Sequence, residues 1–587
     1  MATTFKIRSG RIPTKLLNPC QFYGIIKKLN GVARRGLYAN GEKQDEVNVM
    51  KLSMREIQEN RQVWLDHGYE LPKYDIAAVH AATKAAPEWI HFGAGNIFRA
   101  FIATFVQQLL NEGKLDKGLI VAEGYDYEII DKAYRAYDNL CLSVTLKSGG
   151  SIDKVVVASM AETLKMDPEE PDYERIREVF RSPSLKMASF TITEKGYNVK
   201  GADGTFYPTI EADFTAGPEK VQSYIGKVAA MVYTRYQAGA LPIAMVSMDN
   251  CSHNGTRLYD AINVFAEQWC ARGVADPGFV KYVNDPEKVG FPWTMIDKIT
   301  PRPDAKVIEM VKADGFEGAD AVKTAKGTFV APFVNAEETQ YLVMQDWFPN
   351  GRPNIEDVPG VMFADRETVD KVERMKVCTC LNPLHTALAV YGCMLGYTLI
   401  SEEMKDAQLR RLIEVIGYRE GLPVVVDPGV LNPKTFIDTV VNVRLPNVFM
   451  PDSPQRIATD TSQKLAIRFG ETIKAYQKRP DLNVADLKIV PLVFAGWLRY
   501  ALGVDDAGKP FTPSDDPVLP EVQKALSGIK LGDKGPFADA LRPILSDAHI
   551  FGVDLYKAGL GALCEKYFEE LVAGPGAVRA TLVKYLG

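Results

Sequence analysis

Residues 88–99 read Glu-Trp-Ile-His-Phe-Gly-Ala-Gly-Asn-Ile-Phe-Arg, a short apolar run that ends in a Gly-x-Gly turn. Apolar residues at helical spacing follow from Phe98 to Leu110. A strand, a glycine turn and a helix in this order open a βαβ unit. Gly93 would permit the tight turn, and Gly95 would let a pyrophosphate approach the backbone N–H groups at the start of the helix. Phe98 stands where the usual third glycine would be, so a plain strand–helix turn is the alternative.

The pattern continues beyond this turn as alternating strands and helices. Further strands are predicted at Leu119–Ala122, Val155–Ala158, Met187–Thr191 and Ile243–Ser247, with a helix at Glu219–Ala238. Such alternation indicates a mostly parallel sheet covered on both faces. The later sequence instead shows long helical segments, at Thr368–Leu399, Lys405–Gly417, Ser462–Lys478 and Tyr556–Val572. The fold class is therefore α/β, with a Rossmann-like doubly wound N-terminal domain and a mainly α-helical C-terminal domain.

Three regions are expected along the chain. Residues 1–85 form an N-terminal extension of mixed character, with a helix-like segment at Met54–His67. Residues 86–362 form the dinucleotide-binding domain, and residues 363–587 form the helical domain that carries substrate-binding and catalytic groups. The sequence assigns no function to the extension.

The composition argues against several classes of protein. Of 587 residues 46% are hydrophobic and 24% charged, and 69 Lys and Arg against 74 Asp and Glu give a net charge of −5. There is no basic excess to suggest nucleic-acid binding. No apolar stretch reaches the roughly 18 residues of a membrane span, and the first residues lack the apolar core of a signal peptide. We expect a cytoplasmic protein. The eight cysteines are scattered, and Cys378 and Cys380 are poorly spaced for one metal ion, so no metal site is expected.

Acidic residues follow the second predicted strand. Glu123 and Asp126 come directly after Leu119–Ala122, where a ribose-binding carboxylate is expected. A carboxylate there would favour NAD because it accepts the 2′-hydroxyl and repels a 2′-phosphate. The alternative is an acidic side chain in a solvated loop.

A polar cluster follows the strand Ile243–Ser247, beginning with Asp249 and Asn250. Polar side chains at the carboxyl end of a parallel strand are typical of α/β binding sites. We also expect one of these two residues to cap the helix Gly255–Trp269.

A third cluster lies within an apolar helical stretch and contains Lys376, Asn382 and His385. A lysine, an amide and an imidazole on a buried helix are costly unless they are paired or functional. Together they could supply a proton donor, a hydrogen-bond donor to a carbonyl and an orienting group. For His385 alone, a satisfied core histidine is the alternative.

From about residue 89 to about residue 500 the chain resembles the polyol-specific long-chain dehydrogenases, or mannitol dehydrogenase family, which includes fructuronate and tagaturonate reductases. The motifs that carry the resemblance are Gly93–Arg99, Thr193–Tyr197, Asp249-Asn250 with Asn254-Gly255, Phe291–Pro301, Gln345–Pro353, Leu381-Asn382 with His385, and Arg456–Asp460 with Ser462 and Lys464. Their number and order make the assignment specific.

The resemblance implies a metal-independent hydride transfer between NAD and a ketose-type carbonyl. Lys376 would be the general acid in reduction and the base in oxidation, since the pKa of a buried lysine falls readily. The implied catalytic set is Lys376, Asn250, Asn382 and His385, with both amides donating to the developing alkoxide. The implied substrate-binding set is Asp297, Arg456, Lys464 and Lys195. The implied cofactor-binding set is Gly93, Gly95, Asn96, Phe98, Arg99, Glu123, Asp126 and Glu194.

One spacing departs from the family pattern. The family places its lysine five residues before the asparagine, whereas Lys376 precedes Asn382 by six, and Val377 occupies the usual place. On a regular helix Lys376 and His385 would point to opposite sides. We predict a one-residue π-bulge that restores the phase; if the helix is regular instead, Lys371 becomes a candidate.

Two further departures are Lys298 in place of arginine and Trp293 in place of asparagine.

The expected substrate is a small sugar acid or polyol. Lys195 in the motif Thr193–Tyr197 resembles the fructuronate reductase version of the family more than the mannitol version. A hexuronate carboxylate also needs a cationic partner, for which Arg456 and Lys464 are candidates, and the same two residues could equally bind hydroxyl groups. We expect reduction of fructuronate to mannonate. Mannitol–fructose and tagaturonate–altronate interconversion are the alternatives, and a non-catalytic dinucleotide sensor is the alternative of another class. The sequence leaves the oligomeric state and the choice between NAD and NADP open.

Overall fold

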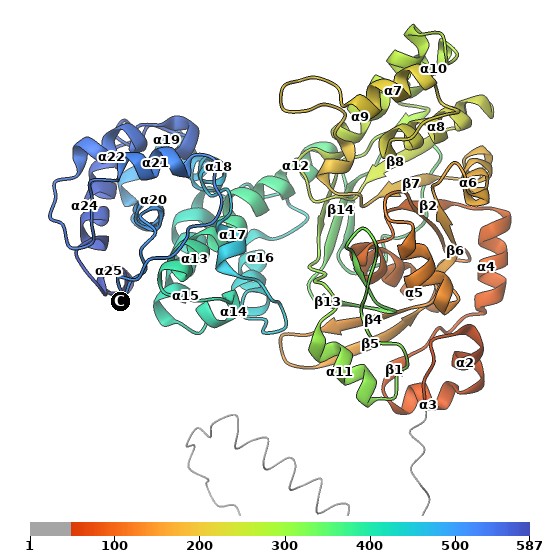
Figure 1. Ribbon diagram of the computed structural model, residues 1–587, viewed down its shortest axis with the longest axis horizontal. Helices are drawn as coiled ribbons and strands as arrows, with labels where there is room; N and C mark the ends of the chain where they lie inside the picture. Colours follow the sequence, from red (N-terminus) through yellow and green to blue (C-terminus); the bar gives the residue numbers. More distant parts are fainter. Residues whose placement is uncertain (1–48) are drawn as a thin grey trace, which may run out of the picture. The chain divides into compact units, whose positions relative to one another are not determined.

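The doubly wound sheet is present in the computed structural model, which describes residues 49–587 (Figure 1). Its six strands run parallel in the order β6-β3-β2-β7-β8-β9. Their bounds are β2 Trp89–Phe92, β3 Leu119–Glu123, β6 Met160–Lys165, β7 Met187–Phe190, β8 Ile243–Ser247 and β9 Val289–Gly290. The strand order reverses between β2 and β7, and this switch point is where open α/β sheets bind ligands.

Helices cover both faces of this sheet because alternate strand residues are apolar on each side. One face packs on α6 (Pro171–Arg181), α8 (Tyr224–Gln237) and α9 (Asn254–Ala271), and its core includes Ile90 and Phe92. The other face packs on η1 (Phe98–Ile102), α5 (Ala103–Asn111) and η2 (Ile130–Tyr134), and its core includes Trp89. The predicted α/β architecture is confirmed.

A second, four-stranded sheet has the order β1-β5-β4-β13. Its strands are β1 Tyr69–Glu70, β4 Cys141–Leu146, β5 Ile152–Val157 and β13 Phe333–Glu337. The strand predicted at Val155–Ala158 belongs here and pairs antiparallel with β4, so its assignment to the parallel sheet is wrong. The strand that completes the parallel sheet is β6, which follows β5 almost directly and so gave no separate sequence signal.

Residues 49–85 contribute to this second sheet. They form α2 (Met54–Glu59), α3 (Arg61–Asp66), β1 and α4 (Ile76–Ala85), and β1 pairs in parallel with β5. The proposed boundary at residue 85 therefore separates elements that pack together. Residues 1–48 of the proposed extension, with Cys20, lie outside the described residues.

The remaining elements before the helical part are short. They are the helices η3 (Arg135–Tyr137), η4 (Glu194–Tyr197), α7 (Pro208–Ala216), α10 (Gly278–Val283) and α11 (Ala305–Ala313), the pair β11 (Val322–Lys323) and β12 (Phe329–Val330), and the sheet of β10 (Thr294–Asp297), β14 (Tyr341–Gln345) and β15 (Val361–Ala364).

Every named element after β15 is a helix. The helices are α12 Arg366–Met375, η5 Lys376–Cys380, α13 Asn382–Met394, α14 Ile400–Glu403, α15 Ala407–Glu414, η6 Val415–Gly421, η7 Leu422–Val424, α16 Pro433–Thr439, η8 Val440–Arg444, α17 Pro454–Ala458, α18 Ser462–Leu465, η9 Ala466–Gly470, α19 Glu471–Lys478, η10 Val484–Asp486, α20 Ile489–Ala501, α21 Leu519–Ala525, α22 Ala538–Leu545, α23 Ala548–Phe551, α24 Gly561–Leu571 and α25 Ala577–Leu586.

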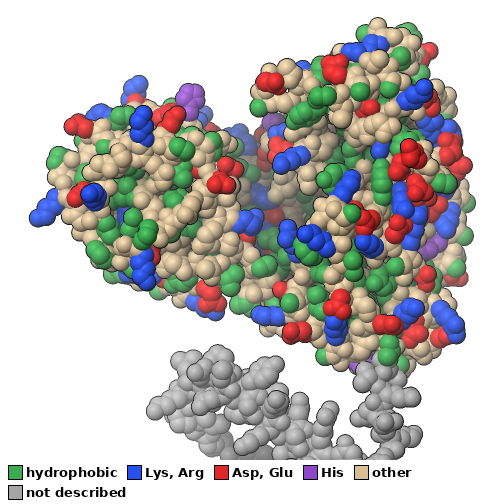
Figure 2. Space-filling view, in the orientation of Figure 1, with side chains coloured by type: hydrophobic (Ala, Val, Ile, Leu, Met, Phe, Trp, Pro, Cys, Tyr) green, Lys and Arg blue, Asp and Glu red, His purple; other side chains and the backbone are tan. Residues whose placement is uncertain are grey.

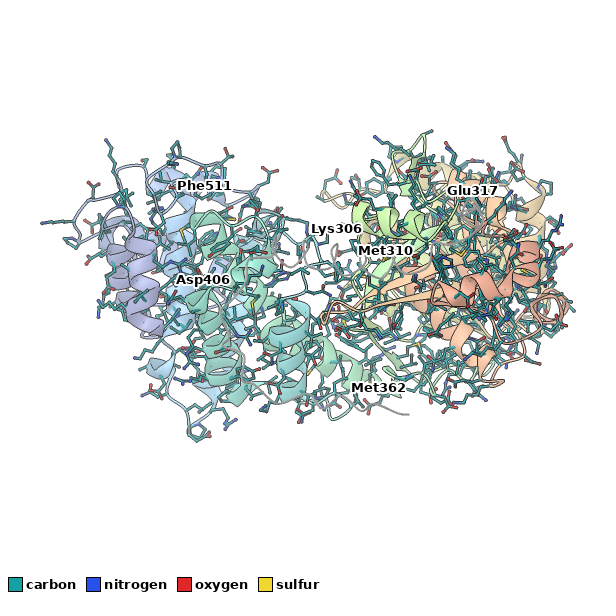
Figure 3. All side chains as sticks on the ribbon, turned by 90° about the horizontal axis from the view of Figure 1, so that it is seen from below. Lys306, Met310, Glu317, Met362, Asp406 and Phe511 are labelled. Carbon is teal, nitrogen blue, oxygen red and sulfur yellow. The ribbon has the colours of Figure 1, made fainter. Side chains whose placement is uncertain are left out.

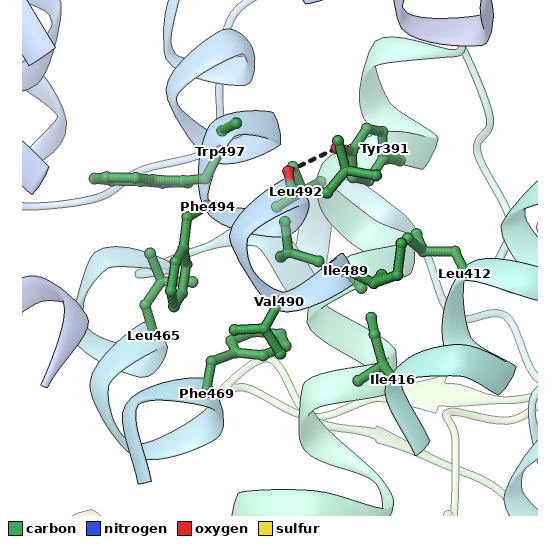
Figure 4. Packing of buried hydrophobic residues seen from close by; sticks show 14 of the residues in the cluster. Tyr391, Leu412, Ile416, Leu465, Phe469, Ile489, Val490, Leu492, Phe494 and Trp497 are labelled. Atoms are coloured by element: carbon green, nitrogen blue, oxygen red, sulfur yellow. Dashed lines mark hydrogen bonds between the residues drawn. The ribbon is translucent and has the colours of Figure 1, made fainter. Parts of the chain in front are cut away.

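The apolar helix α20 lies at the centre of this helical part. Phe494 and Trp497 pack in one core cluster with Leu465 and Phe469, and the Tyr391 hydroxyl donates to the Leu492 carbonyl at 2.8 Å (Figure 4). Figure 3 places Asp406, the N-cap of α15, among these helices. This core gives the helical part a rigid base for the groups it presents.

The surface of residues 49–587 mixes charges of both signs. On the face drawn in Figure 2, Lys and Arg side chains are interspersed with Asp and Glu. Among these residues no helix has the length and apolar character needed to cross a membrane.

Candidate functional site

The turn after β2 depends on its first glycine. Gly93 has a φ of +106°, and a Cβ placed there would lie 2.3 Å from the carbonyl oxygen of Thr191 at the end of β7. At Gly95 a Cβ would meet no atom of residues 49–587 within 4 Å. Gly93 therefore lets two strand ends approach closely, whereas Gly95 borders open space. The chain becomes helical at Asn96, so the turn leads directly into a helix N-terminus.

Glu123 at the end of β3 holds this turn from the neighbouring strand. Its Oε2 accepts the Ala94 N–H at 2.9 Å, and its Oε1 accepts the N–H groups of Tyr125 and Asp126 at 2.8 and 3.1 Å. The Asp126 carboxylate accepts the hydroxyl of Thr324 at 2.7 Å. Both acids are buried at the carboxyl end of the sheet, so neither is a solvated loop residue.

A cavity of about 620 Å³ opens at the ends of β2, β3 and β7. Of the predicted site residues, those that line it are Gly93, Gly95, Glu123, Asp126 and Lys195. The structure thus places Lys195, a predicted substrate residue, beside the predicted cofactor residues. The volume is in the range of small-molecule and cofactor sites.

Four predicted cofactor residues are not among the residues that line this cavity. Asn96 donates to the Pro301 carbonyl at 3.2 Å. Phe98 is fully buried and stacks on His91. Arg99 is also buried and donates to the Ala331 carbonyl at 2.7 Å, while Glu194 is exposed and pairs with Arg257 at 3.0 Å. Asn96, Phe98 and Arg99 therefore support the turn through these contacts and do not line the cavity.

Asp249 holds the loop after β7. Its carboxylate accepts the N–H groups of Ile192 and Thr193, both at 2.9 Å, and the Tyr197 hydroxyl at 2.5 Å. The prediction that Asp249 or Asn250 caps the next helix is wrong, because the N-cap of α9 is His253 and no side chain accepts there. The Asp249 carboxylate is turned to the neighbouring strand end instead.

Lys376 lies at the contact between the sheet part and the helical part. Its side chain is 4% exposed, and its Nζ lies 3.3 Å from Asn250 Oδ1, 3.3 Å from Asp297 Oδ1 and 3.4 Å from the Ile296 carbonyl. The three elements that meet here are η5, the loop after β8, and β10. Lys376, Asn250 and Asp297, which the sequence singled out separately, are thus brought together.

The backbone around Lys376 is a π-helix, as the residue spacing predicts. The segment η5 runs from Lys376 to Cys380 between α12 and α13, and Leu381 leaves helical geometry with φ −127° and ψ −61°. The predicted single helix Thr368–Leu399 is therefore interrupted at this point. A π-helical segment is therefore present where the bulge was predicted, and the Lys376 ammonium lies beside Asn250. The phase match of Lys376 with Asn382 and His385 stays a prediction.

Two charged residues that sequence reasoning missed complete the surroundings of Lys376. Arg444 at the end of η8 donates to Asp297 at 2.6 and 3.2 Å and to Glu337 of β13 at 2.8 and 3.1 Å. Glu337 also accepts the Ile299 N–H at 2.8 Å. The sequence signal was weak: Arg444 is a lone charge in the run Val-Val-Asn-Val-Arg-Leu, and Glu337 closes a strand.

The electrostatics of this group follow from burial and pairing. Burial lowers the pKa of Lys376, and the nearby Arg444 lowers it further, against the opposing attraction of Asp297. Burial alone would raise the pKa of Asp297, but the charges of Arg444 and Lys376 outweigh it and hold that pKa low. A lysine with a lowered pKa beside an ionised carboxylate is suited to proton transfer near neutral pH.

The other predicted residues of the helical part lie on α13, α17 and α18. Among the described residues, neither Asn382 nor the His385 ring has a hydrogen bond or ion pair with Lys376. His385 Nε2 lies 3.0 Å from Asp452 Oδ2 but is not directed for a hydrogen bond. Arg456 is largely exposed and pairs with the same Asp452, and Lys464 donates to backbone carbonyls including that of Thr459. Asp452 therefore links His385 of the predicted catalytic set to Arg456 of the predicted substrate-binding set.

Two family models match the chain in succession. The mannitol dehydrogenase Rossmann domain matches residues 87–357, and the mannitol dehydrogenase C-terminal domain matches residues 368–559.

Several relatives align with this chain over nearly their whole length. A protein named D-mannonate oxidoreductase from Thermotoga maritima is 51% identical over 91% of this chain and 98% of its own. A protein of the same name from Escherichia coli is 27% identical over 83% of this chain and 97% of its own. A polyol:NADP oxidoreductase from Gluconobacter oxydans is 29% identical over 78% of this chain and 87% of its own.

Two solved structures share the fold. Substrate-free D-sorbitol dehydrogenase superposes with a TM-score of 0.71 and 25% identity, covering 88% of this chain and 97% of its own. Mannitol 2-dehydrogenase from Pseudomonas fluorescens, solved with NAD and D-mannitol, has a TM-score of 0.64 and 24% identity, covering 92% of this chain and 99% of its own. The chain belongs to the mannitol dehydrogenase family of oxidoreductases.

Proposed function

We propose that this protein catalyses the NAD(H)-dependent, reversible reduction of fructuronate to mannonate. The observation that carries the proposal is the buried Lys376 ammonium, which lies 3.3 Å from both Asn250 and Asp297. The substrate is supported by the 51% identity to a D-mannonate oxidoreductase over almost the full length of both chains. The chemistry is supported by membership of a dehydrogenase family.

The cavity at the strand ends fits a dinucleotide. Gly95 leaves open space beside a helix N-terminus, where a pyrophosphate would meet free N–H groups. Glu123 and Asp126 place negative charge where the adenosine ribose would lie, which favours NAD over a 2′-phosphorylated cofactor. When bound, the nicotinamide would supply or accept the hydride.

Lys376 serves as the acid in reduction and as the base in oxidation. In reduction its ammonium donates a proton to the substrate carbonyl oxygen as the carbon gains hydride. Asn250 accepts from Lys376 through Oδ1, which leaves its amide N–H groups free to donate to the developing alkoxide. Asn382 is proposed as the second amide donor, and His385 as the group that holds a neighbouring hydroxyl.

The remaining cations are proposed to bind the far end of the sugar acid. Arg456 can bind a carboxylate through two parallel N–H groups once it leaves Asp452. Lys464 lies on the next helix, with an ammonium partly buried among backbone carbonyls. A hexuronate needs such a cationic partner, whereas a neutral polyol does not.

The test is loss of NADH absorbance with purified protein and fructuronate, tagaturonate or fructose in parallel, each repeated with NADPH. We expect turnover with fructuronate and NADH, unchanged by EDTA. Lys376→Met should reduce turnover by about 10²–10⁴-fold while NADH binding, followed by fluorescence, persists. Lys371→Met is the matched control, because Lys371 lies on the preceding helix and pairs with Glu367 on the surface.

Three outcomes would contradict the proposal in different ways. Preference for tagaturonate or fructose would reject the substrate. Full activity in Lys376→Met, or loss of activity in Lys371→Met, would reject the assigned acid. NADH binding without turnover on any of the three would support a dinucleotide sensor.

A further inference from the structure

Four buried charges from four separate elements form a chain behind the candidate catalytic site. They are Lys376 of η5, Asp297 of β10, Arg444 of η8 and Glu337 of β13, and none is more than 7% exposed. Two positive and two negative charges balance one another. Removing such a set of charges from water costs free energy. The fold does not require it, because apolar residues of similar volume at the same positions would stabilise the protein equally well. Its presence beside a proton-transfer group points to a role in that transfer.

The two cations compete for one carboxylate. Asp297 Oδ2 accepts from Arg444 Nη1 at 2.6 Å, while Oδ1 is shared between Arg444 Nη2 at 3.2 Å and Lys376 Nζ at 3.3 Å. Arg444 remains charged at any relevant pH. Lys376 therefore contacts only Oδ1 of Asp297, at 3.3 Å, and this oxygen already accepts a hydrogen bond from the permanently charged Arg444.

Glu337 fixes Arg444 in this position. Its two oxygens receive Arg444 at 2.8 and 3.1 Å, and it also accepts the Ile299 N–H. Lys298 donates to the main-chain carbonyl of Glu337 at 3.0 Å. The guanidinium is therefore clamped between two carboxylates and cannot turn away from Lys376.

The other groups that face Lys376 carry no charge. They are the Asn250 amide, the Ile296 carbonyl and the ring of Tyr341, whose centroid lies 5.9 Å from Nζ. Among the described residues, the charged groups that act on Lys376 are thus Asp297, Arg444 and Glu337.

We propose that Arg444, clamped by Glu337, is a positioning residue that weakens the hold of Asp297 on the Lys376 proton and so sets the pH at which this lysine exchanges its proton with substrate. The inference rests on the proposed function, in which Lys376 is the acid and base. It requires the Arg444 charge and its shared oxygen, and it requires no contact between Arg444 and substrate.

The first test is the pH dependence of mannonate oxidation, because oxidation needs neutral Lys376 and rises as that group loses its proton. Arg444→Met should move the rising limb upward by about one pH unit or more, since a repelling charge is removed and Asp297 serves Lys376 alone. The double variant Arg444→Met with Glu337→Gln removes one charge of each sign and serves if the single variant fails to fold. It should also shift the limb upward, but by less, because the attraction of Glu337 for the Lys376 proton is removed together with the repulsion of Arg444. Arg444→Lys keeps the positive charge, so the rising limb of its pH profile should stay within about half a pH unit of that of the wild type.

Arg579→Met is the matched control. Arg579 donates to both oxygens of Asp406 in the helical part, at 2.9 and 2.5 Å, and should leave the pH profile in place when removed. A uniform loss of rate at every pH, with no displacement of the limb in either Arg444→Met variant, would overturn the proposal. A shift as large in Arg579→Met would also overturn it.

A second measurement separates this inference from the substrate assignment. Competitive acetylation of the full-length protein with trace acetic anhydride, read by mass spectrometry of the peptide that contains Lys376, reports the protonation of this lysine without substrate. The rise of labelling with pH should begin at lower pH in wild type than in Arg444→Met. Equal labelling profiles would overturn the inference even if fructuronate is the substrate, whereas a displaced profile would support it even if another substrate is found.

Discussion

Substituting alanine at Gly93 tests the glycine turn, and Gly95→Ala is its matched partner. A Cβ at Gly93 would lie 2.3 Å from the Thr191 carbonyl oxygen, and the backbone there has a φ of +106°. Thr191 follows directly after β7, and its N–H donates a hydrogen bond to the Phe92 carbonyl of β2. The Thr191 carbonyl therefore cannot move independently of the two strands. Left-handed strain of about 1–2 kcal/mol and overpacking of about 1–3 kcal/mol together give a loss of roughly 2–5 kcal/mol.

Gly95→Ala should behave differently because its Cβ would meet no atom of the described part of the chain within 4 Å. We expect its stability to stay within about 1 kcal/mol of wild type, or to rise slightly, since alanine restricts the unfolded chain. The new methyl group would nevertheless occupy the space over which a pyrophosphate must pass. Binding of NADH should therefore weaken by about tenfold or more.

The assay is thermal unfolding followed by circular dichroism, together with NADH titration followed by protein fluorescence. Gly93→Ala should lower Tm by about 3–9 °C and weaken NADH binding, whereas Gly95→Ala should weaken binding with Tm retained. Wild-type NADH affinity in Gly95→Ala would refute the placement of the cofactor over this turn. An unchanged Tm in Gly93→Ala would refute the close approach of the two strand ends.

Two further changes probe buried carboxyl groups. Glu123→Gln would point an amide N–H₂ group at backbone N–H groups that now donate to the Glu123 carboxylate. The free energy of unfolding, measured by thermal unfolding, should therefore fall by about 1–3 kcal/mol. An unchanged Tm would contradict these contacts. Glu403 is buried against Gly392 and has no hydrogen-bond partner among residues 49–587, and burial raises its pKa to about 9. Its folded-state pKa lies above its unfolded value, so the protein loses stability as pH rises from about 4.5 toward 9, by up to about 1.4 kcal/mol per pH unit. Glu403→Met should therefore raise Tm more at pH 8 than at pH 5, and an equal change at both would show that Glu403 is not held neutral.

The local part of the fold could be predicted from the sequence. The strand, glycine turn and helix of residues 88–110 lie within one short stretch, so apolar spacing and two glycines suffice to indicate them. Strands β3, β7 and β8 were located for the same reason. Strand β5 was assigned to the wrong sheet, because pairing partners are set by contacts between distant residues.

The candidate site shows the same division. The spacing of Lys376 and Asn382 predicted a π-helix, since helical phase is a property of consecutive residues. The roles of Asp249 and Arg444 were not predictable in this way. Asp249 binds backbone N–H groups nearly sixty residues earlier in the chain, where a local cap had been expected.

The sequence by itself therefore determined the fold class, the family and the identity of the buried lysine, because each of these depends on periodicity or on motifs within short segments. Only the tertiary structure decided which charges surround that lysine. Asp297, Glu337 and Arg444 come from β10, β13 and η8, and they meet because the sheet part and the helical part pack together at η5. A charge that is isolated in its own segment carries no sign of its partner, and the cost of burying it is met only when the folded chain supplies that partner.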